Sequence, residues 1–243
     1  MSETAIQARF TREWLKASPD FSRVFHLGYR LTSSEPFPRK NGFPAALIDA
    51  IAGYHYLVTV LGFHPRNICI AGESAGGHLA LSLVRYLTLH DLPGLPVPGS
   101  LVLLCPCADL GGSCIGSQTW VKNAQADYTL TFYYGYITRA MLGSLPEEMA
   151  VSSPWFSPGS PYLPETSGLF KGFPPTLLIV AGTECGVDTQ RTLRDRLRDD
   201  LGEKVEYVEF EDAIHAFMMF RWHAPEDAEA RRIITRWTNE VHA

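Results

Sequence analysis

Short apolar runs alternate along the chain with longer segments of helical periodicity. The apolar runs predict five β-strands, at residues 24–29, 67–72, 100–105, 176–181 and 205–210. Elsewhere apolar residues recur every three or four positions, which predicts helices at 11–17, 44–61, 75–89, 189–201 and 225–241. Strands alternating with helices are typical of βαβ units. We therefore expect an α/β fold with a mainly parallel sheet of about five strands flanked by helices.

Residues 106–175 interrupt this alternation. The segment is too long for a simple connection between two strands, is rich in aromatic side chains, and ends in a stretch rich in Pro, Ser and Gly. Long insertions inside compact domains are commonly lids or binding loops. We expect a helical, aromatic lid here, with a helical packing insert as the alternative. The lid is expected to belong to a single domain that spans residues 1–243.

Composition excludes several classes of protein. The chain has 243 residues, 46% of them apolar, and a net charge of −5. Its Lys and Arg residues are scattered, which argues against nucleic acid or an anionic membrane surface as a partner. No apolar run approaches the roughly 20 residues needed to span a bilayer. The N-terminus lacks the pattern of a secretory signal, which predicts a cytoplasmic location.

The five cysteines point to no disulfide framework. They are odd in number and irregularly spaced: Cys69, Cys105, Cys107, Cys114 and Cys185. Three of them lie close together in the sequence, but no paired Cys/His set has the spacing of a zinc finger. We interpret all five as small buried apolar residues in a reducing compartment, and we expect neither a metal nor a cofactor.

The sharpest chemical signal is the sequence Gly-Glu-Ser-Ala-Gly at 72–76, where a predicted strand leads directly into a predicted helix. This pattern at a strand–helix junction is typical of a nucleophile elbow. We expect Gly72 and Gly76 to be required because the backbone passes close to the neighbouring strand and helix. Ser74 is the candidate nucleophile, and the Ala75 amide is the candidate donor to an oxyanion. The alternative is a tight packing turn.

A serine nucleophile needs a base, and the base needs an acid that orients it. His215 follows the last predicted strand, at the edge of the sheet where ligands bind. The other seven histidines lie in predicted helices, in a strand, in loops or at the terminus. The loop after residues 176–181 offers two carboxylates, Glu184 and Asp188. The order nucleophile, acid, histidine is that of an α/β-hydrolase.

Segments at 28–31, 36–38, 43–50, 72–80, 174–179 and 212–217 carry a resemblance to a known family. The chain resembles the hormone-sensitive-lipase-like branch of the α/β-hydrolases, and most of all its fungal esterase and deacetylase members. The resemblance implies that Glu184, five residues after Ile179, is the acid of a catalytic triad with Ser74 and His215, and Asp188 is kept as the alternative acid. It also implies a serine hydrolase that cleaves a small apolar or acetylated carboxylic ester through an acyl-enzyme.

The resemblance also implies a truncated form of the fold. The family normally begins with three further strands and a His-Gly-Gly-Gly loop that completes the oxyanion hole, and the sequence contains no such segment. A strand is then missing between those expected at 24–29 and 67–72. We expect these two strands to pair directly, and a homodimer to cover the remaining gap, because residues 1–10 make a poor buried strand.

The missing loop supports an alternative function. This is a hydrolase-derived protein that does not hydrolyse: a cyclase or lyase acting on a secondary metabolite, or a ligand-binding module. Binding and proton transfer need no tetrahedral oxyanion, so neither activity requires the missing amides.

Overall fold

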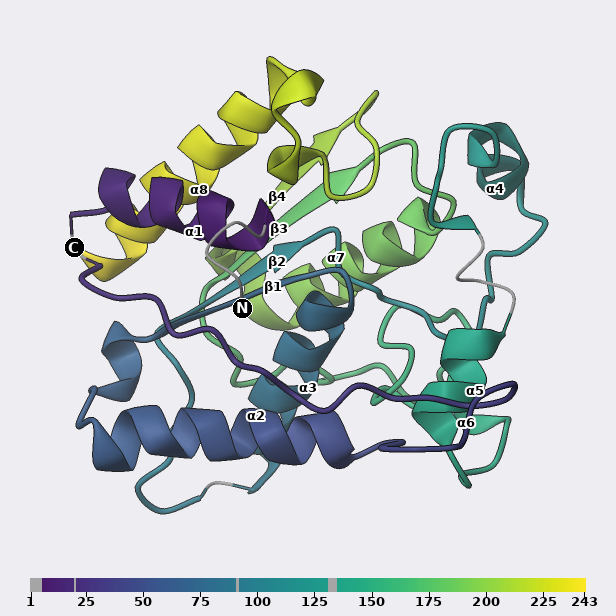
Figure 1. Ribbon diagram of the computed structural model, residues 1–243, viewed down its shortest axis with the longest axis horizontal. Helices are drawn as coiled ribbons and strands as arrows, with labels where there is room; N and C mark the ends of the chain where they lie inside the picture. The colour runs from purple at the N-terminus through teal and green to yellow at the C-terminus, as the bar shows by residue number, and fades with distance from the viewer. Residues whose placement is uncertain (1–5, 20, 91, 131–134) are drawn as a thin grey trace.

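Four parallel strands form the centre of the computed structural model, which describes residues 6–19, 21–90, 92–130 and 135–243 (Figure 1). The strands lie side by side in chain order: β1 (Cys69–Glu73), β2 (Ser100–Leu104), β3 (Thr176–Ala181) and β4 (Val205–Phe210). All three pairings are parallel. The predicted α/β fold is confirmed, and these strands correspond to the last four of the five apolar runs.

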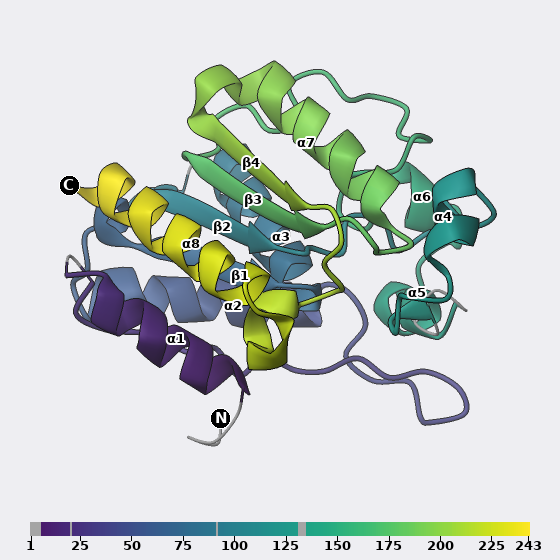
Figure 2. The same cartoon turned by 90° about the horizontal axis from the view of Figure 1, so that it is seen from above.

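Helices lie on both faces of the sheet and beyond the carboxyl ends of its strands (Figure 2). They are α1 (Ile6–Ala17), α2 (Ala45–His55), α3 (Ala75–His90), α4 (Gln118–Asn123), α5 (Tyr136–Leu142), α6 (Met149–Ser152), α7 (Val187–Leu201) and α8 (Glu226–His242). A π-helical turn at Tyr56–Val60 continues α2, and 3-10 turns occur at Pro65–Asn67, Gly202–Lys204, Phe217–Met219 and Arg221–His223. Within the described ranges, no helix has the length and apolar character needed to cross a membrane.

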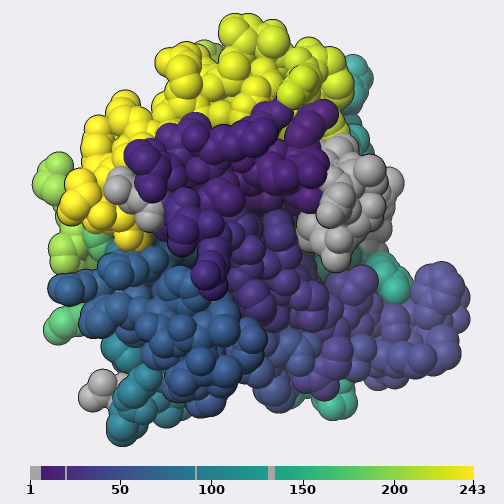
Figure 3. Space-filling model, turned by 60° about the vertical axis from the view of Figure 1, so that its left-hand side comes forward, coloured from purple at the N-terminus to yellow at the C-terminus, as the bar shows by residue number. Residues whose placement is uncertain are grey.

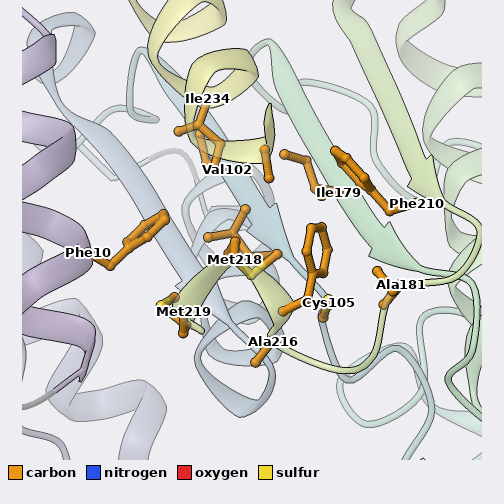
Figure 4. Packing of buried hydrophobic residues seen from close by; sticks show 14 of the residues in the cluster. Phe10, Val102, Cys105, Ile179, Ala181, Phe210, Ala216, Met218, Met219 and Ile234 are labelled. Atoms are coloured by element: carbon orange, nitrogen blue, oxygen red, sulfur yellow. The ribbon is translucent and has the colours of Figure 1, made fainter. Parts of the chain in front are cut away.

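The two faces of the sheet carry separate apolar clusters. Helices α1 and α8 cover one face, whereas α3 and α7 cover the other (Figure 2). On the first face, Val102 and Ile179 pack against Met218 and Ile234, as Figure 4 shows. On the second face, their strand neighbours pack against α3 and α7. Because successive side chains of a strand point to opposite faces, burial on both sides explains why these strands are apolar at nearly every position.

Residues 24–29 do not form the expected fifth strand. Val24 and Phe25 are 43% and 48% exposed, and Leu27 packs against the apolar cluster that includes Leu47, Ala50 and Tyr54 of α2. Arg30 binds the Asp49 carboxylate of α2 through its backbone amide and its guanidinium group. These contacts with α2 hold the chain away from β1, so the predicted direct pairing is wrong.

A groove therefore runs along the free edge of β1. It has a volume of about 860 Å³ and is lined by all five residues of β1 together with α1, α2 and the segment at 21–27. Figure 3 shows the N-terminal segment, in purple, lying across this face of the molecule between α8 and α2. Residues 1–5 lie outside the described part of the chain. The expected homodimer stays a prediction.

The helices of the insert at 106–175 lie beyond the carboxyl ends of the strands (Figure 2), whereas Phe170 and Phe173 near its end pack in the cluster between the sheet and α3 and α7. It contains the three short helices α4, α5 and α6. Trp120 of α4 packs against Cys114 and Cys185, beside the loop that follows β3. Residues 131–134 of the predicted lid lie outside the described residues, and its function as a lid stays a prediction.

Candidate active site

Ser74 lies in a tight turn between β1 and α3. Its backbone has a φ of 54°, a left-handed conformation that is uncommon for a residue with a side chain. The turn is held at three points: the Ser74 amide donates to the Leu104 carbonyl at 3.0 Å, and the Ser74 carbonyl accepts from the amides of Cys107 and His78 at 3.0 and 3.1 Å. These bonds compensate for the backbone strain, which commonly marks functional positions.

The glycines around Ser74 differ in how tightly they are packed. A Cβ added to Gly72 would lie 2.2 Å from the Gly76 carbonyl oxygen, and one added to Gly77 would lie 2.8 Å from Pro106 Cβ. Gly72 is therefore required, as the sequence predicted. A Cβ added to Gly76 would meet nothing within 4 Å, because Gly76 faces the groove beside β1. The expectation that crowding requires Gly76 is wrong.

Ala75 is the exposed first residue of α3. The amides of the first helical turn have no carbonyl partner within their own helix. The helix dipole also favours negative charge at this end. The Ala75 amide therefore has the chemistry needed to stabilise an oxyanion formed beside Ser74.

His215 and Glu184 form a buried pair at the carboxyl ends of β4 and β3. The distance from His215 Nδ1 to Glu184 Oε2 is 3.0 Å, and Glu184 is only 2% exposed. The two loops are also joined directly, because the amide and hydroxyl of Thr183 donate to the Ala213 carbonyl at 3.2 and 2.7 Å. This second connection fixes the acid relative to the histidine.

Two further side chains anchor Glu184. Gln190 Nε2, from α7, donates to Glu184 Oε2 at 3.0 Å. Asn123 Nδ2, from α4, donates to the Glu184 carbonyl at 2.9 Å. Nothing in the sequence pattern distinguished these two residues, because their contacts depend on how α4 and α7 pack.

Asp188, the alternative acid, lies in the first turn of α7 and is directed elsewhere. Its carboxylate pairs with Arg191 at 2.8 Å, and its side chain is 38% exposed. Arg191 is itself paired with Glu209 of β4. The carboxylate that contacts the His215 ring in this loop is therefore that of Glu184.

The second nitrogen of His215 faces a carboxylate instead of the serine. His215 Nε2 lies 3.2 Å from Glu73 Oε1, while Ser74 Oγ makes no hydrogen bond with any described residue. Burial by itself lowers the pKa of His215, but the charges and hydrogen bonds of Glu184 and Glu73 outweigh it and raise the pKa to about 10. In this arrangement the imidazole is protonated at neutral pH. It can accept a proton from Ser74 only after Nε2 has left Glu73.

Tyr128 connects the insert to the histidine. Its hydroxyl donates to the His215 carbonyl at 3.0 Å, and its ring meets the imidazole edge-on at 5.9 Å. The aromatic insert was evident from the sequence, but this contact was not. Glu73 was not predicted either, although its position beside Ser74 in the elbow was a signal that could have been used.

One group of side chains in the described part of the chain could hold a metal ion. The ligand atoms of Cys105, Glu184 and His215 all lie within 4.8 Å of one another, and all three residues are buried. The Cys105 thiol thus lies next to both the acid and the base of the candidate site.

Several known proteins are similar to this chain in sequence or in structure. An esterase from Acinetobacter venetianus is 28% identical over 225 residues, which make up 93% of this chain and 67% of the relative. An acetyl-hydrolase from Streptomyces hygroscopicus is 29% identical over 197 residues, or 81% of this chain and 59% of the relative. A solved hormone-sensitive lipase from a metagenome library is 27% identical, with a TM-score of 0.68 over 88% of this chain and 65% of its own.

The chain thus spans about three fifths to two thirds of the length of these relatives. The fungal subtype and the absence of the His-Gly-Gly-Gly portion stay predictions. A family model described as the alpha/beta hydrolase fold matches residues 9–219, a range that includes both the elbow and His215. Since this range makes up most of the chain, the protein belongs to the α/β-hydrolase fold family.

Proposed function

We propose that this protein is a serine hydrolase that cleaves carboxylic esters through an acyl-enzyme on Ser74. The observation that carries the proposal is the buried Glu184–His215 pair beside an elbow in which Ser74 has a φ of 54°. The names of the two relatives, an esterase and an acetyl-hydrolase, support this class of reaction. The substrate class we propose is a small apolar or acetylated ester, since the half-exposed Tyr128 ring offers an apolar wall beside His215.

The acylation step begins with neutral His215. Nε2 turns from Glu73 to Ser74 Oγ and accepts its proton as Oγ attacks the ester carbonyl. Glu184 holds Nδ1–H and stabilises the imidazolium that forms. The oxyanion is stabilised by the Ala75 amide. His215 then gives its proton to the departing alcohol, which leaves the acyl group on Ser74.

Deacylation repeats these roles with water as the nucleophile. His215 accepts a proton from water, the carboxylic acid leaves, and the proton returns to Ser74 Oγ. Removing one oxyanion donor typically costs about 10²–10³-fold in turnover, and we expect the Ala75 amide to contribute on that scale.

The contact between Glu73 and His215 favours a second candidate function. With Nε2 engaged by a carboxylate, the imidazolium is a proton donor and not a base. A protonated His215 is sufficient for a protein that binds a ligand or protonates a metabolite without hydrolysing it. Such a cyclase, lyase or binding module would use His215 while leaving Ser74 idle.

Labelling with a fluorophosphonate probe tests the two candidates. The probe reacts with a serine that is activated by a neighbouring base, whatever the natural substrate. We expect stoichiometric labelling of Ser74, identified by peptide mass spectrometry, and none in Ser74→Ala or in unfolded protein. A folded wild-type protein that stays unlabelled between pH 6 and 10 would overturn the hydrolase proposal and support the second candidate.

A further inference from the structure

We propose that Cys105, Glu184 and His215 form a binding site for a divalent transition-metal ion, of which Zn²⁺ is the best fit. The site would use the acid and base of the proposed hydrolase together with a thiol to which that reaction assigns no role. A bound ion would therefore switch the hydrolase off.

The three ligand atoms are already close to the spacing that zinc requires. They lie within 4.8 Å of one another. Zinc binds sulfur at about 2.3 Å and nitrogen or oxygen at about 2.0–2.2 Å, so the ligand atoms of a tetrahedral ion lie about 3.3–3.7 Å apart. Because each residue sits where its strand ends, at Cys105 after β2, Glu184 after β3 and His215 after β4, small side-chain movements can close this difference.

The charges around this group favour a cation. The carboxylates of Glu184 and Glu73 and the thiol of Cys105 surround a single imidazole. Glu184 Oε1 is buried and has no hydrogen-bond partner among the described residues. Burying a polar atom without a hydrogen-bond partner costs folding free energy, and a bound cation would supply the missing partner. This oxygen is therefore available as a ligand atom. A thiolate, a carboxylate and an imidazole together match zinc better than magnesium or calcium, which prefer oxygen alone.

The surrounding residues support the ligands in the way that metal sites require. A histidine that binds a metal usually donates its other ring N–H to a carboxylate, and Glu73 Oε1 lies 3.2 Å from His215 Nε2. This contact keeps a proton on Nε2 and so leaves Nδ1 for the metal. Gln190 holds Glu184 in the same way, at 3.0 Å. The contact that blocks proton transfer from Ser74 is thus the one that a metal site needs.

Binding is an exchange of the ion for protons. The Cys105 thiol and His215 Nδ1–H each lose a proton to solvent, three bonds to the metal form, and no group is oxidised or reduced. His215 keeps its Nε2 proton on Glu73. We expect a water molecule to complete the fourth position. With Nδ1 on the metal, Glu184 no longer orients the imidazole, so the ester hydrolysis proposed above stops.

Cobalt substitution tests the site without any ester. Apo-protein is titrated with Co²⁺, and we expect one equivalent to produce the near-ultraviolet charge-transfer band of a thiolate–cobalt bond and the visible bands of a tetrahedral ion. Zn²⁺ should then displace the cobalt one for one in competition with a chromophoric chelator. Cys105→Ser should abolish the thiolate band and weaken zinc binding more than tenfold. The matched control Cys69→Ser, at the start of β1, should leave both unchanged.

Two results would overturn the proposal: a wild-type protein that shows no thiolate band, or a Cys105→Ser variant that keeps the band. The wild-type spectrum decides the matter even if the variant fails to fold. Ser74→Ala should bind zinc as the wild type does, which separates this proposal from the hydrolase proposal. If esters are hydrolysed, zinc should inhibit the wild type reversibly, with recovery on adding a chelator, and should inhibit Cys105→Ser at least tenfold less.

Discussion

The acid–base half of the site and the nucleophile half are built differently. Glu184 is held by Gln190 and Asn123, and its loop is bonded to that of His215 through Thr183. The nucleophile half rests on the backbone of one turn, and Ser74 Oγ makes no hydrogen bond with the described residues. The acid–base half lies between neighbouring strands, whereas the nucleophile follows β1, whose outer edge faces the groove.

This difference indicates where activity is controlled. The acid–base pair is already formed, so orienting His215 requires no further ordering. The connection between the halves is not formed, because Glu73 of the nucleophile half occupies His215 Nε2. Under the hydrolase proposal, the release of Nε2 from Glu73 is the step that joins the two halves.

The largest effect is expected from removing the nucleophile. Ser74→Ala should lower kcat/KM for short p-nitrophenyl esters by roughly 10⁴–10⁶-fold, because no other group in the turn can form the acyl-enzyme. The unfolding free energy should change by less than about 0.5 kcal/mol, since the lost hydroxyl makes no hydrogen bond with the described residues. Steady-state assays with purified protein give kcat/KM, and urea denaturation gives the unfolding free energy. Wild-type turnover by this variant would mean that the measured hydrolysis does not use the elbow.

The next largest effect should come from the acid of the other half. Glu184→Gln keeps the size of the side chain but removes the charge that stabilises the imidazolium, and we expect a loss of about 10⁴-fold in kcat. Asp188→Asn is the matched control and should change kcat less than twofold, because Asp188 pairs with Arg191. Steady-state kinetics of both variants at one pH make the comparison. Equal losses would show that the two carboxylates share the task.

The parts of the fold that could be predicted from sequence are those that local pattern determines. β2 and β3 are buried on both faces, so their apolar runs marked them clearly. The segment at 24–29 also contains an apolar run. Its conformation, however, depends on contacts with α2, such as the hydrogen bond between the Arg30 amide and Asp49. An apolar run forms a strand only if another strand lies beside it to pair with. The sequence of the run does not show whether such a strand is present.

The candidate site follows the same rule. Ser74 and His215 were proposed because each follows a predicted strand, and parallel strands bring their carboxyl ends to one edge. The loop after residues 176–181 offered both Glu184 and Asp188, and the family resemblance favoured Glu184. Glu73 was missed because the elbow pattern leaves the residue before the nucleophile unspecified. Its contact with His215 Nε2 depends on how the loop after β4 folds back, at a separation of more than 140 positions in the sequence.

Removing the Glu73 charge should alter the pH dependence. Two carboxylates raise the pKa of His215 to about 10, so activity of the wild type should increase as the pH rises towards that value. Glu73→Gln should lower this pKa and shift the acidic limb of kcat/KM to lower pH, because each unit of decrease raises the neutral fraction about tenfold. The control Glu206→Gln removes a half-buried carboxylate of β4 that pairs with Arg236, and it should keep the wild-type profile. Superimposable profiles for all three proteins would show that Glu73 does not hold His215 in solution.

Glu73→Gln should also lower the unfolding free energy at neutral and mildly acidic pH. Because the folded pKa of His215 is raised above the ordinary value, the ion pair stabilises the folded state fully below about pH 6.5. This contribution is lost as the pH rises through about 10. The wild type should therefore exceed Glu73→Gln in unfolding free energy near pH 6, and the difference should shrink towards pH 10 in urea melts. A difference that grows with pH would contradict the ion pair.

The smallest effect should come from Gly76, on the open side of the nucleophile half. Its added Cβ would meet nothing within 4 Å, and Ala is favoured over Gly in a helix by about 0.5–1 kcal/mol. Gly76→Ala should therefore raise the unfolding free energy by up to that amount without changing the far-ultraviolet circular dichroism. Gly72→Ala is the matched control and should be strongly destabilising, since its Cβ would lie 2.2 Å from a backbone oxygen. If Gly76→Ala destabilised the protein as much as Gly72→Ala does, the edge of β1 would have to be covered in solution by a further strand or a second subunit, and the open groove would not describe the folded protein.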